Sequence, residues 1–413
     1  MPDLRAREDA STEPEAPLES RENGFRGAAP APINVPAWKR RLFIDRPADL
    51  RAFVADLESA SVLAIDAEFV QNYQRRAPED PSHRLTLLQF ACDNDYRCSY
   101  VVDALRLSDL SPLAVPLERA TLLTLFHGMS SDVRVLASRG LVARHTLDLE
   151  AVSRSLFGQR ESGLSAMLQR AANIHMDKSL QRSDWSRRPL TTAMVAYAAR
   201  DAEMTFALYQ WLSANYPRAI AAYETLPDEP PPEVAAWIRP YLDTGRGRPV
   251  EMALEEIGLL DDRAAQIADL RQALGAALRP NQRSRVMRLI TDLELPELIP
   301  DLRPYLPSSA TEERAGAIRA LGRLHDMASA PDIRLLLEDP IQDVRQAAQT
   351  ALALLEGPAS TRPAIRPERR NGRRVWSTAS DDPANQDEPW RAALRARFKL
   401  SETPDKDEGA AGE

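Results

Sequence analysis

Four carboxylates and one phenol in the first half of the chain are of the types that bind divalent cations and orient water. Asp66 and Glu68 lie two residues apart in the apolar segment SVLAIDAEFV (61–70), so a β-strand would place both on one face. Two carboxylates on one face of an apolar strand repel each other and are costly to desolvate. A divalent cation between them would relieve that repulsion; exposure to solvent at a strand end is the alternative.

The other members of this set come from two further segments. Asp132 follows the buried-type strand TLLTLFHG (121–128) and falls near the start of an expected helix, where the helix dipole favours a carboxylate. An ordinary capping aspartate would occupy the same place. Tyr197 and Asp201 lie four residues apart in a helix expected over 191–212 and therefore share one face. The alternative for these two is a surface pair without a role.

The three places together are more specific than any one of them alone. The four acids supply only oxygen ligands, which select Mg²⁺ or Mn²⁺ rather than zinc. Two such ions close together can activate a water and stabilise both the attacking and the leaving oxygen of a phosphodiester, and a phenol can orient that water. The set therefore predicts a two-metal phosphodiesterase. The predicted catalytic residues are Asp66, Glu68, Asp132, Tyr197 and Asp201, with the four acids as metal ligands.

The domain that must position these residues is expected over 36–220. Apolar segments at 84–92 and 98–104 flank the turn-forming Asp93-Asn94-Asp95 and predict a β-hairpin. After the strands, apolar residues recur at helical spacing through 133–168. Strands that give way to alternating strands and helices predict an α/β domain.

The second half of the chain is expected to be helical and repetitive. A Pro-rich acidic stretch at 221–232 predicts a linker, and PDLR (300–303) recurs 31 residues later as PDIR (331–334). A period of about thirty residues with two helices per unit is typical of an α-solenoid. The units resemble HEAT-type repeats over 231–357.

The composition and the two ends of the chain exclude several classes of protein and suggest where this one is located. Residues 1–35 and 358–413 have few large apolar side chains and predict disordered tails, with a short docking helix at 388–400 as a minority alternative. A balance of 53 Lys and Arg against 61 Asp and Glu excludes a uniformly basic, nucleic-acid-coating protein. Two cysteines exclude a disulfide framework. Because no membrane span or secretory signal is present, we expect a cytoplasmic protein without a membrane partner.

Six further residues are candidates for binding the substrate. Four lie in the segment 178–188, which holds four cations and one acid; they suit phosphates, although a solvated loop has the same composition. An aromatic residue beside Glu68 is expected to stack on or wedge a terminal base, with a core position as its alternative, and a histidine is expected to hydrogen-bond near Asp132. The predicted substrate-binding residues are Phe69, His127, Lys178, Arg182, Arg187 and Arg188.

These motifs resemble the ribonuclease D branch of the DEDD 3′–5′ exonucleases, in the DEDDy subclass with tyrosine in the third motif. DAEF (66–69), HGMSSDVRVL (127–136) and YAARDAEMT (197–205) match the three motifs, and MDKSLQRSDWSRRPLT (176–191) matches the segment before the third. The resemblance spans about 40–215 and departs from the family at Ala67, where threonine is usual. A second departure is the HEAT-like array, which stands where the family carries HRDC modules.

The resemblance implies an RNase H-like fold, with a mixed five-stranded sheet and helices on both faces. It also implies a Mg²⁺-dependent exoribonuclease that takes single-stranded 3′ ends and releases nucleoside 5′-monophosphates. One alternative is an exonuclease of single-stranded DNA or short oligonucleotides, because the catalytic motifs do not read the 2′-hydroxyl. Another is an interaction scaffold with a vestigial nuclease domain. In the leading hypothesis the array binds a protein partner or extends the nucleic-acid track.

Overall fold

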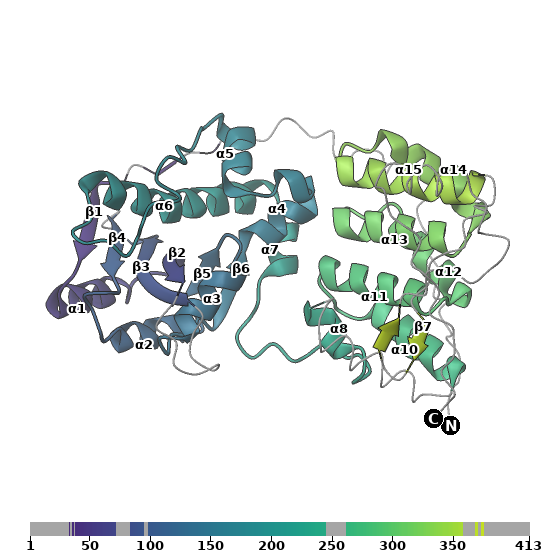
Figure 1. Ribbon diagram of the computed structural model, residues 1–413, viewed down its shortest axis with the longest axis horizontal. Helices are drawn as coiled ribbons and strands as arrows, with labels where there is room; N and C mark the ends of the chain where they lie inside the picture. The colour runs from purple at the N-terminus through teal and green to yellow at the C-terminus, as the bar shows by residue number, and fades with distance from the viewer. Residues whose placement is uncertain are drawn as a thin grey trace, which may run out of the picture. The chain divides into compact units, whose positions relative to one another are not determined.

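The computed structural model shows two units, residues 1–356 and 357–413 (Figure 1). The residues it describes are 33, 35–36, 38–71, 83–94, 98–244, 262–357, 368–370 and 373–375. Most of both predicted tails, including the docking helix at 388–400, lies outside these residues. In the second unit, β7 (Glu368–Arg370) and β8 (Arg373–Val375) pair in antiparallel fashion within the segment expected to lack regular structure.

A mixed six-stranded sheet forms the centre of the N-terminal domain. Its order is β1-β4-β3-β2-β5-β6; β3 runs antiparallel to both of its neighbours and the other pairs are parallel. The strands are β1 (Arg40–Ile44), β2 (Val62–Gln71), β3 (His83–Cys92), β4 (Cys98–Asp103), β5 (Leu123–Phe126) and β6 (His145–Asp148). The predicted β3–β4 hairpin is confirmed.

The count of five strands implied by the resemblance is wrong by one. The extra strand, β1, lies at the edge of the sheet, parallel to β4. Four of its five residues are exposed, and only Ile44 is buried. Its apolar residues are only Leu42, Phe43 and Ile44, a run too short to predict a strand, and no buried face alternates along it.

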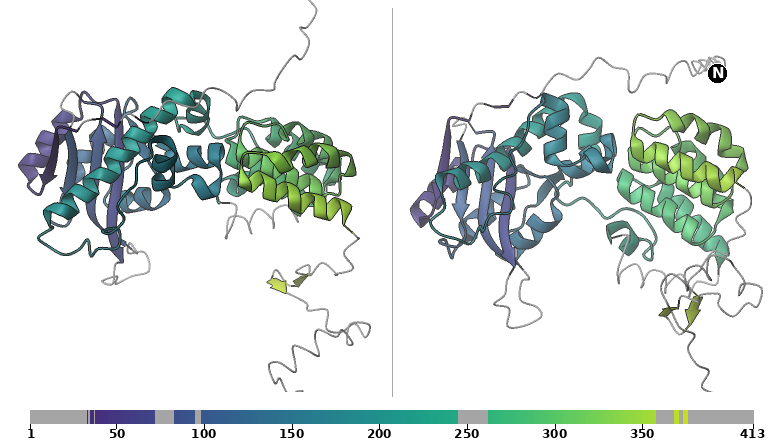
Figure 2. Two further views of the ribbon diagram at one scale, coloured as in Figure 1. Left: turned by 90° about the horizontal axis from the view of Figure 1, so that it is seen from above. Right: turned by 45° about the horizontal axis from the view of Figure 1, so that its top comes forward.

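Helices cover both faces of the sheet (Figures 1 and 2). On one face lie α1 (Pro47–Asp56), η1 (Ser111–Leu113), α2 (Ala114–Leu117) and α3 (Ser130–Ala137). On the other lie α4 (Leu149–Phe157), α5 (Leu164–Ala172), α6 (Thr192–Asn215) and α7 (Pro217–Tyr223), with the short η2 (Gln159–Glu161) after α4. Strand residues alternate between the two cores: Leu63 and Ile65 belong to the first, and Ala64 belongs to the second.

Helix α6 is the element that carries the third acidic motif, and it confirms the helix expected over 191–212. Thr191 caps its start by accepting a hydrogen bond from the backbone N–H of Met194. The helix packs across β2, β3 and β4. It ends where Pro217, which cannot donate an intrahelical hydrogen bond, begins α7. This course brings its N-terminal half over the centre of the sheet.

Two segments expected to be loose are anchored to the domain. Ile33, at the end of the predicted N-terminal tail, is buried and donates its backbone N–H to the carbonyl of Ala171 at 3.2 Å. In the predicted linker, Thr225 exchanges two backbone hydrogen bonds with Thr146, at 2.8 and 3.2 Å. Both contacts lie outside the bounds 36–220 that the sequence suggests for the domain.

The second half of the chain is an array of helices, as predicted. Its elements are α8 (Arg239–Thr244), α10 (Arg263–Gly275), α11 (Pro280–Asp292), η3 (Pro296–Leu298), α12 (Ile299–Leu302), η4 (Arg303–Tyr305), α13 (Thr311–Arg323), η5 (Met327–Ser329), α14 (Ala330–Leu335), η6 (Leu336–Glu338) and α15 (Gln342–Glu356). The starts of α11, α13 and α15 are 31 residues apart, and these helices pack side by side. Within the described ranges, no helix is both long and apolar enough to span a bilayer.

The packing of α13 against α15 depends on a glycine. A Cβ added at Gly322 would lie 2.7 Å from Cβ and 2.8 Å from Cα of Ala351. Replacing Gly322 with alanine is therefore expected to force the helices apart and to lower the free energy of unfolding by about 1–3 kcal/mol. Urea unfolding measures this change. Gly275→Ala is the matched control, because nothing lies within 4 Å of its added Cβ; equal midpoints for the two variants would contradict the prediction.

Candidate active site

Strand β2 places the first two acids on the face that α6 covers. Ile65 and Ala67 point into the core with α1 and α3. By alternation, Asp66 and Glu68 point to the opposite face. The β2–β3 register shifts between Glu68 and Phe69, which marks a β-bulge. At this bulge the hydroxyl of Thr86 donates a hydrogen bond to the carbonyl of Glu68 at 2.8 Å.

The acids of three separate segments meet in one cavity. One ligand oxygen from each of Asp66, Glu68 and Asp201 lies within 4.8 Å of the other two. Asp132, from the first turn of α3, lines the same cavity of about 710 Å³, and so does Tyr197. The structure thus brings together all five residues of the predicted catalytic set.

The cavity strongly disfavours four ionised carboxylates. Burial is the main cause in each case, and it raises the pKa of Asp66 to about 6 and that of Asp201 to about 7. Burial and repulsion from the other three acids raise the pKa of Glu68 to about 9. Burial and the nearby Asp66 and Asp148 raise the pKa of Asp132 to about 8. A divalent cation would relieve this repulsion, and an all-oxygen donor set fits such an ion.

Tyr197 lies one turn before Asp201 on α6, and its ring packs against that of Trp185. The two ring centroids are 6.0 Å apart, and Trp185 is buried. Burial and the negative charges of Asp201 and Glu68 raise the pKa of Tyr197 to about 12. The phenol is therefore protonated at neutral pH, so it can donate a hydrogen bond within the cavity.

The loop that leads to Asp132 is held by a residue of the neighbouring strand. The carboxylate of Asp148 accepts hydrogen bonds from the backbone N–H groups of Gly128 (2.8 Å) and Met129 (3.3 Å). The same side chain caps α4 through the N–H of Glu150. Gly128 has φ +85°, and an added Cβ would lie 2.9 Å from a carboxylate oxygen of Glu150, so the turn requires glycine.

Three of the six predicted substrate-binding residues line the cavity, namely Phe69, His127 and Lys178. The ring of His127 contacts the carbonyl of Ser162 at 3.0 Å, and burial lowers its pKa. Phe69 packs its ring edge-to-face with His83, at 5.1 Å between centroids. Glu150, Arg160 and Gln181 also line the cavity and were not predicted. Glu150 and Arg160 lie outside the motifs, whereas Gln181 lies within the matched segment 176–191 but was given no role.

The other three predicted residues lie elsewhere. Arg182 and Arg187 are exposed and are not part of the described cavity lining. Arg188 also lies outside it, and its guanidinium pairs with Asp103. The expectation that Arg188 binds phosphate therefore needs correction. The cation count of the segment could not show that one of its charges is already neutralised within the fold.

The mixed sheet between helical layers carries a half-buried cluster of acids of the kind that can hold a divalent cation. Residues 42–216 match the family described as 3′–5′ exonuclease. Ribonuclease D from Shewanella sp. (strain ANA-3) is 30% identical over 172 residues, which cover 41% of this chain and 42% of that protein. Ribonuclease D from Acidiphilium cryptum (strain JF-5) is 28% identical over 309 residues, which cover 73% of this chain and 72% of that protein.

Comparison with solved structures gives matches of lower identity. The crystal structure of Escherichia coli RNase D matches with 19% identity and a TM-score of 0.38, over 87% of this chain and 83% of that one. The chain spans about two fifths of the length of the first curated relatives it matches. Residues 42–216 are accordingly similar to the 3′–5′ exonuclease domains of proteins named ribonuclease D.

Proposed function

We propose that this chain is an exoribonuclease that removes nucleoside 5′-monophosphates from the 3′ ends of single-stranded RNA. The observation that carries the proposal is the convergence of Asp66, Glu68 and Asp201 within 4.8 Å, in a cavity also lined by Asp132 and Tyr197. The similarity to proteins named ribonuclease D supports RNA as the substrate.

The four acids would hold two Mg²⁺ or Mn²⁺ ions. When bound, such ions supply an activated water and stabilise the charge that develops on the phosphate. The protonated phenol of Tyr197 orients the attacking water by hydrogen bonding. Lys178, exposed at the margin of the cavity, attracts a backbone phosphate, and Phe69 offers its ring to the terminal base.

The helical array is proposed to be a HEAT-like solenoid. The 31-residue spacing of α11, α13 and α15 supports this assignment. Its proposed role is to bind a protein partner or to extend the path of the RNA beyond the cavity.

The direction and the substrate class are tested with one RNA labelled in turn at each end. With Mg²⁺ present, the 5′-labelled strand should give a ladder of progressively shorter products, and the 3′-labelled strand should release labelled mononucleotide at once. A DNA strand of matched sequence should be degraded more slowly. Internal cleavage or shortening from the 5′ end would contradict the exonuclease proposal, and preferential degradation of DNA would contradict the substrate class.

A further inference from the structure

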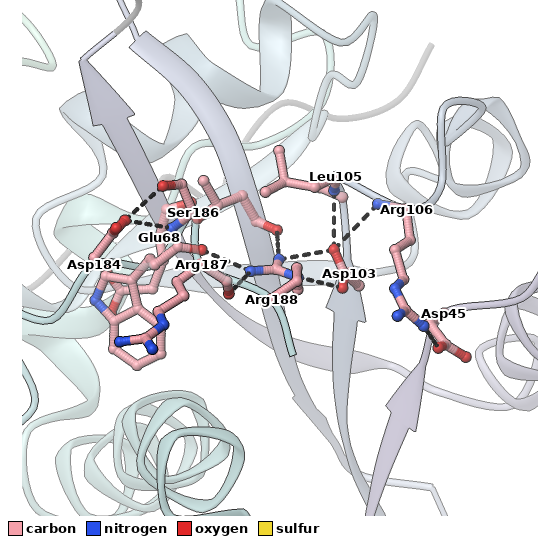
Figure 3. A network of polar contacts seen from close by, with 12 residues as sticks. Asp45, Glu68, Asp103, Leu105, Arg106, Asp184, Ser186, Arg187 and Arg188 are labelled. Atoms are coloured by element: carbon pink, nitrogen blue, oxygen red, sulfur yellow. Dashed lines mark hydrogen bonds and ion pairs between the residues drawn. The ribbon is translucent and has the colours of Figure 1, made fainter. Parts of the chain in front are cut away.

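Arg188, which is half-buried, and Asp103, which is buried, form an ion pair beside the candidate active site (Figure 3). The guanidinium meets the carboxylate through two hydrogen bonds, Nε to Oδ2 at 2.6 Å and Nη2 to Oδ1 at 2.8 Å. Asp103 is fully buried, and its Oδ1 also accepts the backbone N–H groups of Leu105 and Arg106. Such two-pronged pairing fixes orientation as well as charge.

The remaining N–H groups of Arg188 hold backbone carbonyls. Nη1 donates to Trp185 at 2.8 Å and to Arg187 at 2.9 Å, and Nη2 donates to Thr86 at 3.1 Å. Together with the two bonds to Asp103, these use all five N–H donors of the guanidinium. No donor is left to bind a phosphate.

Two of these carbonyls belong to residues that contact the catalytic set. Trp185, whose carbonyl Arg188 holds, packs its indole against the ring of Tyr197. Thr86, held in the same way, donates its hydroxyl to the carbonyl of Glu68 at the β-bulge. Arg188 is therefore one residue removed from the phenol of Tyr197 on one side and from the backbone of Glu68 on the other.

We propose that Arg188, fixed by Asp103, is a positioning residue for the reaction. It holds Trp185 against Tyr197 and so keeps the phenol directed into the cavity. This inference rests on the proposed function only for its kinetic consequences. It distinguishes Arg188 from a phosphate-binding arginine, whose loss would weaken substrate binding and lessen its salt dependence.

The kinetic test uses Arg188→Lys, which keeps the positive charge and removes the planar guanidinium that forms two hydrogen bonds with Asp103. We expect kcat for RNA to fall about 10–100-fold with little change in KM, because a small displacement of a catalytic group is costly. Arg314→Lys is the matched control: it loses a buried two-pronged pair, with Asp339, in the helical array. The control should keep the wild-type kcat.

A double-mutant cycle asks whether Arg188 acts through the phenol. In a Tyr197→Phe background, Arg188→Lys should lower kcat little further, because the group that it positions is already absent. If Arg188 only supported the fold, the two losses would multiply and the proposal would fail. A rise in KM with unchanged kcat would overturn it in favour of phosphate binding.

A spectroscopic readout makes the inference independent of nuclease activity. In protein labelled with 3-fluorotyrosine, the ¹⁹F resonance of Tyr197 is assigned by its loss in Tyr197→Phe. That resonance should shift in Arg188→Lys and in Trp185→Phe, and it should stay in place in Arg314→Lys. An unmoved signal in Arg188→Lys would overturn the positioning role. A wild-type protein that degrades no RNA would instead refute the proposed function, with the resonance shift still deciding this one.

Discussion

Replacing Asp66 with asparagine is expected to lower the rate of RNA hydrolysis by about 10³-fold, equivalent to about 4 kcal/mol of transition-state stabilisation. Asp66 lies at the centre of the acidic cluster, within 4.8 Å of the ligand oxygens of Glu68 and Asp201. Asparagine has the same shape as aspartate, so the packing around position 66 is unchanged, but one of the charges that would hold a divalent cation is removed. Single-turnover hydrolysis of end-labelled RNA measures the effect.

The same substitution should leave the metal-free protein at least as stable as the wild type. Burial raises the pKa of Asp66 to about 6, so its ionised form is unfavourable in the folded state at neutral pH. If Asp66→Asn lost activity because it unfolds, its midpoint of thermal unfolding would instead be lower than that of the wild type. Asp109→Asn is the control, because this exposed carboxylate accepts a hydrogen bond from Ser111 and is not part of the described cavity lining. Near wild-type hydrolysis by Asp66→Asn would refute the assignment of the site.

The catalytic residues could be predicted because the spacing of residues along each segment shows which of them share a face. The separation of Asp66 from Glu68 fixes one strand face, and that of Tyr197 from Asp201 fixes one helix face. Their convergence depends on which strands and helices become neighbours, and local spacing does not contain that information. It was inferred from the combination of residue types and from the resemblance, and the structure places all five side chains in one cavity.

The features that the sequence did not reveal concern residues whose partners are distant in sequence. Arg188 pairs with Asp103, 85 residues earlier in the chain, and the sequence around either residue does not indicate this pairing. Ile33 is buried by contacts with a helix that begins at Leu164 and ends at Ala172. Charge counts and local composition describe what a segment contains, whereas these residues are defined by what the fold brings to them.

In the absence of divalent cations, the free energy of unfolding of this protein is expected to fall as the pH rises. The pKa values of the four acids are raised, to between about 6 for Asp66 and about 9 for Glu68. In the unfolded chain the same groups titrate near pH 4. Between about pH 4 and pH 9 the folded state therefore binds more protons than the unfolded state, so the free energy of unfolding falls with increasing pH.

A bound cation reverses this trend, because it needs the ionised carboxylates and replaces their protons. The increase in unfolding temperature caused by Mn²⁺ should therefore be larger at pH 8 than at pH 6. Thermal unfolding is measured with and without Mn²⁺, in the wild type and in Asp201→Asn. The difference between the two proteins isolates the contribution of the acidic cluster from that of the other ionisable groups. The variant should lose most of the Mn²⁺ effect and part of the pH dependence of the metal-free protein. A Mn²⁺ effect of equal size at both pH values would show that these acids do not bind the metal, since binding without proton release requires ligands that are already ionised.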